Sequence, residues 1–297
     1  MSARGARERV EHPSRGIALV LAGTGLITLN DAAIKAVVLE HPLGQAVFLR
    51  GLFVLLPIAF LVMRAGGWKA MAVRSASGQA LSAGLLVGAL FLFVFSLSRL
   101  PLSICVIIIY TNPLFVTALA PLIVGERVGW RRWGAVLLGF LGTVLILWPD
   151  QSGFSWLLLV PLAASLLTAL RDLVTRRLVV GETSVSILAY SSLAVTLCAL
   201  PVAAFDWEPL GLDDFALLAG AGLAFTFGLF CLTDSLRYAD ASLISPFKYS
   251  GVVLAAVLGY LIWSEVPDLA DLAGAGLIMA SGLFILHRER RMAPDQL

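Results

Sequence analysis

The feature that most constrains this chain is a succession of apolar segments, each close to the roughly 20 residues that a helix needs to cross a bilayer. Because hydrocarbon offers backbone groups no hydrogen-bond partner, such segments cross as helices. Ten qualify, with approximate bounds 17–38, 44–64, 79–98, 102–123, 131–148, 154–175, 184–203, 213–236, 241–263 and 270–287. The sequence therefore predicts an all-α integral membrane protein with short connections.

Composition agrees with a membrane location. Charged residues make up 13% of the chain, whereas a soluble domain has roughly 25%. A net charge of +2 is too small to indicate a nucleic-acid partner, so the lipid bilayer is the partner that composition indicates. Cys105, Cys198 and Cys231 each lie alone in an apolar run without C-x-x-C spacing, so they favour packing roles, and no metal or other cofactor is expected.

The distribution of Lys and Arg predicts the orientation, because cytoplasmic loops are enriched in both. With the N-terminus inside, sixteen of these residues lie in inner loops and tails, and only Arg99 lies in an outer connection. The sixteen are Arg4, Arg7, Arg9, Arg15, Arg64, Lys69, Arg74, Arg127, Arg131, Arg132, Arg176, Arg177, Arg237, Arg288, Arg290 and Arg291. Both termini are therefore expected in the cytoplasm, and a miscounted span would have scrambled this separation.

The chain also contains an internal repeat. Arg99 and Glu126 flank one apolar span as Arg237 and Glu265 flank another, at offsets of 138 and 139 residues. The first and sixth spans correspond as well, since each carries an acidic residue four positions before a basic one, at an offset of 141. The turn-rich residues 149–153 join the two copies.

The repeat predicts two five-helix units. They cover residues 17–148 and 154–287, with cytoplasmic tails at 1–16 and 288–297. Five is an odd number, so the second unit enters the membrane inverted relative to the first. Inverted repeats are typical of secondary transporters, because exchanging the conformations of the two units converts an outward-facing state into an inward-facing one.

These features resemble a known family. The chain has two five-span units, each with an Arg before its fourth span and a Glu after it, and Lys35 and Arg50 match basic positions of the first two spans. It resembles the EamA-type branch of the drug/metabolite transporter (DMT) superfamily, and is most similar to the YddG-type amino-acid exporters. The resemblance implies a bacterial inner-membrane carrier with a central cavity lined by the first four helices of each unit.

Polar residues at depth in the first two spans are candidate substrate ligands, because charges inside a membrane are costly and usually functional. They are Asn30, Asp31, Lys35 and Arg50. One interpretation is that Asp31, Lys35 and Arg50 bind the amino and carboxylate groups of a zwitterion. The alternative is that the charges neutralise one another and fix helix packing, with Lys35 extending to the interface.

Two polar interruptions occur at equivalent points of the repeat. Tyr110 begins one, ahead of Pro113, and Lys248 with Tyr249 lies in the other, after Pro246. Irregular backbone at membrane depth is tolerated where it lines a cavity or is packed within protein. The pair indicates either a shared central cavity or two structural kinks.

Two aromatic residues of the third span complete the candidate site. Phe91 and Phe95 lie four positions apart, on one helix face, and either contact the substrate or pack against lipid and core. Small residues in the fifth and tenth spans, such as Gly142 and Gly274, favour close helix approach. Those two spans are interpreted as a scaffold or a homodimer contact.

The leading hypothesis is a secondary transporter that exports small metabolites, specifically aromatic or other neutral amino acids, across the bacterial inner membrane by alternating access. Export of other metabolites or drugs is an alternative, as is a channel or a non-transporting scaffold. An enzyme is disfavoured, because His12, His41 and His287 lie outside or at the margins of the spans and no G-x-S-x-G motif occurs.

Overall fold

A computed structural model describes residues 12–126, 128–148, 155–179, 181–239 and 241–292. Every regular element within these residues is a helix. The elements are α1 (Pro13–Val38), α2 (Leu43–Arg64), η1 (Gly67–Met71), α3 (Ala76–Leu97), α4 (Leu102–Ile109), α5 (Asn112–Ile123), α6 (Trp130–Leu147), η2 (Trp156–Leu158), α7 (Leu159–Leu178), α8 (Ser184–Phe205), α9 (Leu212–Ser235), α10 (Ala241–Lys248), α11 (Ser250–Trp263) and α12 (Leu269–Met292).

Ten segments of the described chain are long and apolar enough to cross a membrane, which confirms the predicted helix number. Two of them are interrupted. One span consists of α4 and α5, which meet at Tyr110 and Thr111, and another of α10 and α11, which meet at Tyr249. Pro113 stands in the first turn of α5 and Pro246 inside α10. Proline lacks an N–H and disfavours helix geometry just before it, so each proline weakens the helix near the break.

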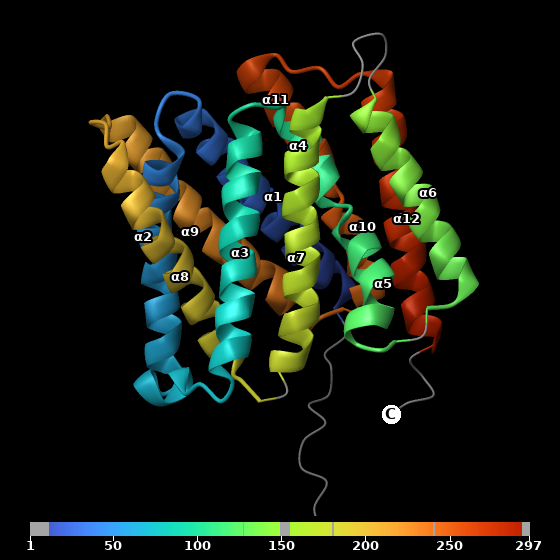
Figure 1. Ribbon diagram of the computed structural model, residues 1–297, viewed down its shortest axis with the longest axis horizontal. Coiled ribbons are helices and arrows are strands. Elements are labelled where there is room, and N and C mark those ends of the chain that lie inside the picture. Colours follow the sequence, from blue (N-terminus) through green and yellow to red (C-terminus); the bar gives the residue numbers. More distant parts are fainter. Residues whose placement is uncertain (1–11, 127, 149–154, 180, 240, 293–297) are drawn as a thin grey trace, which may run out of the picture.

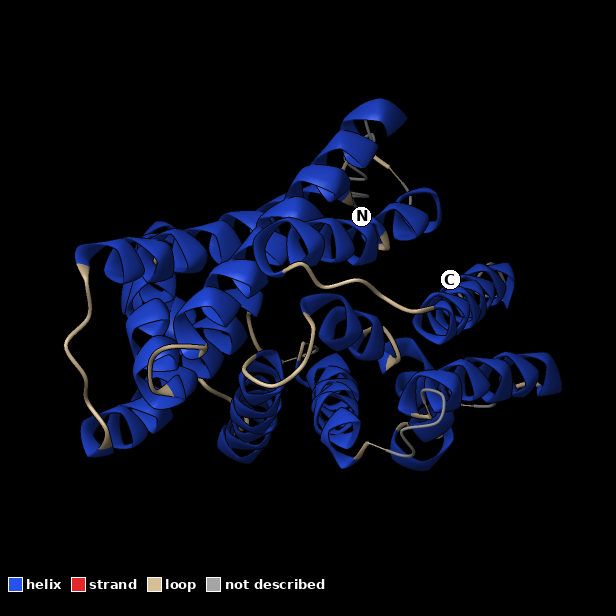
Figure 2. Cartoon of the chain, turned by 90° about the horizontal axis from the view of Figure 1, so that it is seen from above, coloured by secondary structure: helices blue, strands red, loops and turns tan. Residues whose placement is uncertain are grey.

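Eight of the spans pack in a closed cycle. Going round it, α1 contacts α9, then follow α2, α8, α3, α7, the α4–α5 span and α11, which returns to α1. The remaining two, α6 and α12, pack on each other outside the cycle, at the right of Figure 1 and of the view from above in Figure 2. This separation agrees with the interpretation of the fifth and tenth spans as a scaffold.

The packing partners are those of an inverted repeat. Exchanging the two units converts the α1–α9 contact into α7–α3, and the α2–α9 contact into α8–α3, and all four contacts are present. The α2–α8 and α6–α12 pairs each map onto themselves. The two units are therefore intertwined, since most neighbours in the cycle belong to opposite units.

Glycine allows the closest of these contacts. A Cβ atom on Gly142 of α6 would lie 2.8 Å from the carbonyl oxygen of Gly274, and one on Gly274 would lie 2.6 Å from that of Gly142. Gly23 of α1 and Gly228 of α9 are related in the same way, at 2.8 Å in both directions. A side chain at these positions would push the helices apart.

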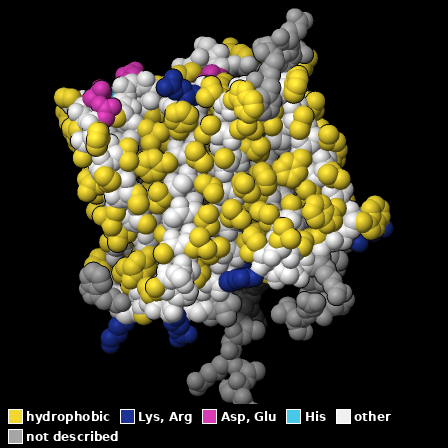
Figure 3. Space-filling model, viewed as in Figure 1, with side chains coloured by type: hydrophobic (Ala, Val, Ile, Leu, Met, Phe, Trp, Pro, Cys, Tyr) yellow, Lys and Arg dark blue, Asp and Glu magenta, His cyan; other side chains and the backbone are white. Residues whose placement is uncertain are grey.

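The outer surface is that of a membrane protein. Figure 3 shows apolar side chains covering the middle of the visible face, with most basic groups at the lower edge and acidic groups at the upper edge. The lower face, where α1 begins and α12 ends (Figure 1), is called the inner face here, in accordance with the predicted cytoplasmic termini. The opposite face is called the outer face.

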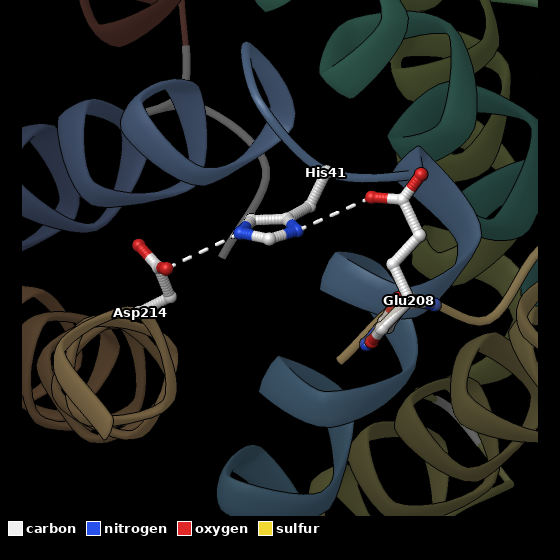
Figure 4. Close-up of polar contacts among 4 residues, drawn as sticks. His41, Glu208 and Asp214 are labelled. Carbon is white, nitrogen blue, oxygen red and sulfur yellow. Dashed lines mark hydrogen bonds and ion pairs between the residues drawn. The ribbon is translucent and has the colours of Figure 1, made fainter. Parts of the chain in front are cut away.

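Polar contacts join the two units at the outer end of α2 and α8. His41 lies between two carboxylates of the second unit, with Nε2 3.2 Å from Asp214 Oδ2 and Nδ1 3.6 Å from Glu208 Oε2 (Figure 4). Gln45 donates to the carbonyl oxygen of Glu208 at 2.7 Å and accepts from its backbone N–H at 3.1 Å. The α1–α2 loop and the start of α2 are thus fixed to the α8–α9 loop and the start of α9.

The inner end of α2 and α8 is joined as well. The carboxylate of Glu182 accepts hydrogen bonds from the backbone N–H groups of Arg74 and Ser75, at 2.7 and 2.8 Å. Thr183 donates to the carbonyl oxygen of Ala70 at 2.8 Å. The α7–α8 loop of one unit is therefore fixed to the α2–α3 connection of the other.

Candidate functional site

A cavity of about 260 Å³ lies between helices of both units. It is lined by Thr24, Ile27, Thr28, Asp31, Phe93, Val106, Ile109, Tyr110, Leu232 and Lys248. The first unit supplies the acidic residue Asp31, and the second supplies the basic residue Lys248. Most of the remaining wall is apolar.

The helical period explains how α1 forms one wall. Thr24, Ile27, Thr28 and Asp31 follow one another at intervals of three, one and three residues, which places them on a single helix face. The hydroxyl of Thr28 donates to the carbonyl oxygen of Thr24 at 3.0 Å, so its proton is satisfied inside the helix. Its oxygen keeps acceptor capacity for a bound molecule.

Asn30 connects Asp31 to a buried cation. Its Nδ2 donates to Asp31 Oδ1 at 2.8 Å, and its Oδ1 accepts from Arg50 Nε at 2.8 Å. The guanidinium carbon of Arg50 also lies 4.4 Å from the ring centroid of Phe225. Asn30 and Arg50 are buried, so they orient Asp31 and balance its charge from behind the cavity wall.

The two helix breaks meet across the units. Tyr110 at the first break donates its hydroxyl proton to the carbonyl oxygen of Lys248 at 2.6 Å. The rings of Tyr110 and Tyr249 lie 4.9 Å apart between centroids. Because α10 ends at Lys248, this carbonyl has no next helical turn to bond with, and Tyr110 satisfies it. The break positions the Lys248 side chain at the cavity.

The structure brings three of the predicted site residues together at the cavity, namely Asp31, Tyr110 and Lys248. Asn30 and Arg50 stand behind Asp31, and buried Tyr249 packs on Tyr110. Phe93, which the sequence analysis did not select, lines the cavity, whereas Phe91 packs against the core and Phe95 is 38% exposed. The substrate contacts expected of Phe91 and Phe95 stay predictions.

Lys35 takes part in a different cluster nearer the outer face. Its ammonium group forms an ion pair with Glu265 and donates to the carbonyl oxygen of Leu100 at 2.8 Å. It also lies 4.9 Å from the ring centroid of Trp263. With 3% of its side chain exposed and these partners in place, Lys35 is occupied by protein contacts in this conformation.

Comparison with known proteins assigns the chain to a family. The sequence profile of the EamA-like transporter family matches residues 14–148 and again residues 154–287. The chain belongs to the EamA-like transporter family. A solved crystal structure, covering 93% of this chain and 99% of its own, superposes with a TM-score of 0.63 at 18% identity and shows the same fold.

Characterised relatives are transporters of small metabolites. The chain is 31% identical to the S-adenosylmethionine uptake transporter of Rickettsia prowazekii over 199 residues, 67% of this chain and 68% of the relative. It is 27% identical to the pseudopaline exporter of Pseudomonas aeruginosa over 270 residues, 90% and 94% of the two chains. A riboflavin transporter of Rhizobium johnstonii is 32% identical over 67% of this chain and 66% of its own.

These findings establish the general function. This EamA-like chain of the DMT superfamily is a multi-pass protein of the bacterial inner membrane and transports a small metabolite. Its relatives are transporters and not enzymes, which agrees with the expectation from the sequence. They include both uptake and export proteins, so the family alone does not define direction or substrate.

Proposed function

We propose that this protein exports amino acids, or molecules with an amino-acid group, from the cell by alternating access. The observation that supports the proposal is the pair of opposite charges in one cavity, Asp31 from the first unit and Lys248 from the second. A zwitterion carries one positive and one negative group, so it can pair with both residues at once. Its ammonium group would face Asp31 and its carboxylate Lys248, so each of the two charges would meet an opposite charge of the substrate.

The rest of the cavity fits such a substrate. The hydroxyl oxygens of Thr24 and Thr28 lie on the same face of α1 as Asp31 and can accept from an ammonium group. Phe93, Ile109 and Leu232 form apolar wall for a substrate side chain. This composition favours neutral side chains, aliphatic or aromatic, because a second charge would have no partner among them.

The size of the cavity points to a small molecule. Its volume of about 260 Å³ is below the range of about 300–1,000 Å³ that is usual for drug-sized ligands. An amino acid is therefore a better fit than a drug in this conformation. The relative named as an S-adenosylmethionine transporter supports the chemical class, since that molecule contains the α-amino and α-carboxylate groups of methionine.

Counterflow in proteoliposomes tests the proposal. Vesicles are loaded with unlabelled leucine or phenylalanine, and entry of the labelled amino acid is followed for wild type, Lys248→Ala and Lys69→Ala. Lys69 lies in η1, away from the cavity, and serves as the matched control. We expect saturable counterflow to fall about tenfold to a hundredfold in Lys248→Ala only, because a hydrogen bond to a charged group contributes about 1.5–3 kcal/mol.

Substrate analogues sharpen the assignment of the two charges. Phenylethylamine lacks the carboxylate and phenylpropionate lacks the ammonium group, so wild type should be inhibited weakly by both. Lys248→Ala should lose its discrimination against the amine, and Asp31→Asn its discrimination against the acid. Equal discrimination in all three proteins would contradict the zwitterion site. Conductance without saturation or counterflow would indicate a channel.

A further inference from the structure

Two glutamates occupy equivalent positions on opposite faces of the membrane. Glu265 follows α11 near the outer face, and its backbone N–H donates to the carbonyl oxygen of Gly259 at 3.1 Å. Glu126 follows α5 near the inner face, and its N–H donates to Ala120 at 3.4 Å. In both turns the backbone thus folds back onto the end of the preceding helix, and that helix belongs to the cycle of eight spans.

Each glutamate faces a cation of the opposite unit. Lys35 of α1 faces Glu265, and Arg176 of α7 faces Glu126. Lys35 and Arg176 occupy equivalent positions in the first helix of their units. The inverted repeat therefore produces one cross-unit ion pair near each face.

The outer pair is closed. Glu265 forms the ion pair with Lys35 through Oε1 and accepts from the backbone N–H of Leu102 through Oε2, at 2.8 Å. Only 3% of the Lys35 side chain and 16% of the Glu265 side chain are exposed. The carboxylate thus joins α1, the start of α4 and the end of α11, which are neighbours in the cycle.

The inner pair is open. Arg176 and Glu126 are 4.0 Å apart, and 50% and 37% of their side chains are exposed. The main contact of Glu126 is with Arg132 of its own unit, at 2.8 Å. An exposed pair at this distance contributes little to stability. The neighbouring Arg177 donates to the carbonyl oxygen of Ile123 at the same end, and this contact is exposed as well.

We propose that these two ion pairs are gates that close in alternation, and that Glu126 moves from Arg132 to Arg176 when the inner gate closes. The structure then represents the state closed to the outside. Opening outward separates Lys35 from Glu265, and closure of the inner end brings Glu126 and Arg176 together and buries them. The assignment extends the proposed alternating-access transport and makes Lys35 a gate residue instead of a substrate ligand.

Substitution of one glycine, Gly259, offers a way to open the outer gate alone. A Cβ atom on Gly259 would lie 2.8 Å from Glu265 Oε2, whereas the equivalent position in the inner turn is already Ala120. The clash involves only the far end of a flexible side chain, so Gly259→Ala should displace the carboxylate and leave the helix in place. Gly276→Ala is the matched control, because nothing lies within 4 Å of a Cβ atom there.

Cysteine accessibility measures the gate without any transport assay. A Thr28→Cys reporter in the cavity, in a chain whose three native cysteines are replaced by alanine, is labelled from the outside with a membrane-impermeant maleimide. We expect Gly259→Ala to raise the labelling rate about tenfold, which corresponds to a shift of about 1.4 kcal/mol between the two states. Gly276→Ala should label like the parent, and equal rates in both variants would overturn the outer gate.

The inner gate is tested in the Gly259→Ala background. Arg176→Gln removes the partner that Glu126 needs in the outward-open state, so outside labelling should fall again. Arg64→Gln, an exposed arginine at the inner end of α2, is the control and should change nothing. Unchanged labelling in Arg176→Gln would overturn the role of that residue.

Charge reversal separates a gate from a binding site. If Lys35 acts through Glu265, Lys35→Glu and Glu265→Lys should each raise outside labelling, and the double variant should restore it. Lack of restoration in a double variant that elutes as a folded protein would contradict the pair. Because labelling needs no substrate, the gates can be supported even if amino-acid counterflow fails, and the reverse also holds.

Discussion

The two sides of the helix cycle differ in how their ends are held. On the side of α2 and α8, both ends are joined across the units, by His41 and Gln45 at the outer face and by Glu182 at the inner face. On the side of α4 and α11, the outer end is closed by Glu265, and the equivalent inner pair is open. The α2–α8 side is therefore joined alike at both ends, whereas the two ends of the α4–α11 side differ.

The difference indicates where movement takes place. A side that is joined at both ends cannot open at either without losing contacts, so it is suited to act as a hinge. A side that is closed at one end only can open that end while the other end closes. α1 packs on α9 and α2 on α8, so contacts between the two units extend along the cycle. We expect the breaks at Tyr110 and Tyr249 to accommodate the change.

The largest expected effect comes from a glycine on the hinge side. A Cβ atom on Gly44 would lie 2.6 Å from a methyl carbon of Val202 and 2.8 Å from the backbone nitrogen of Ala203. Backbone cannot move aside as the Glu265 side chain can, so overpacking should destabilise Gly44→Ala by about 1–3 kcal/mol. The yield of folded protein and its melting temperature in detergent check this. A melting temperature as high as that of Gly259→Ala would contradict the distinction between the two sides.

A smaller effect is expected at the inner end of the hinge. Glu182→Gln keeps the size of the side chain and removes the charge that strengthens both hydrogen bonds from Arg74 and Ser75. We expect a lower melting temperature without a change in outside labelling of the cavity reporter. Glu40→Gln, an exposed carboxylate of the α1–α2 loop, is the control. A rise in labelling would place Glu182 among the gates.

The same carboxylate predicts a pH dependence. Hydrogen bonds from the backbone N–H groups of Ser75 and Arg74 hold the pKa of Glu182 below its ordinary value. A carboxylate with a lowered folded-state pKa stabilises the fold above its unfolded pKa, and this contribution is lost as the pH falls through the folded pKa. The melting-temperature difference between wild type and Glu182→Gln should therefore be constant near neutrality and shrink in acid. A difference that grows in acid would contradict this assignment.

The spans could be predicted from the sequence because the bilayer imposes them. Length and apolarity suffice to define a membrane helix, and Pro113 and Pro246 mark the two broken ones. The pairing of charges could not be predicted in this way. Lys35 and Glu265 are 230 positions apart, and their contact depends on how ten helices pack. The sequence therefore indicated that Lys35 needs a partner, but it did not identify Glu265 as that partner.

The orientation of a helix is also hard to predict from its sequence when all of its faces are apolar. Phe91, Phe93 and Phe95 lie in α3, which faces lipid, core and cavity at once, so no polar stripe shows which of them points inward. Asp31 was easier to place because a carboxylate at membrane depth needs polar surroundings, and Asn30 precedes it. Polar residues thus indicated the candidate site, and its apolar wall required the structure.

The smallest expected effect is at the outer end of the hinge, where His41 and Gln45 both hold the α8–α9 connection. His41→Ala removes the bond to Asp214 at 3.2 Å, but Gln45 still holds the backbone of Glu208 in both directions. We expect a loss of stability of about 0.5–1.5 kcal/mol, the usual net contribution of one hydrogen bond, and no gain in outside labelling. Because the Gln45 contacts share the same loop, His41→Ala combined with Gln45→Ala should cost more than the sum of the single changes. Strict additivity would show that the two contacts act independently, and increased labelling in the double variant would move this end of the molecule from the hinge to the gate.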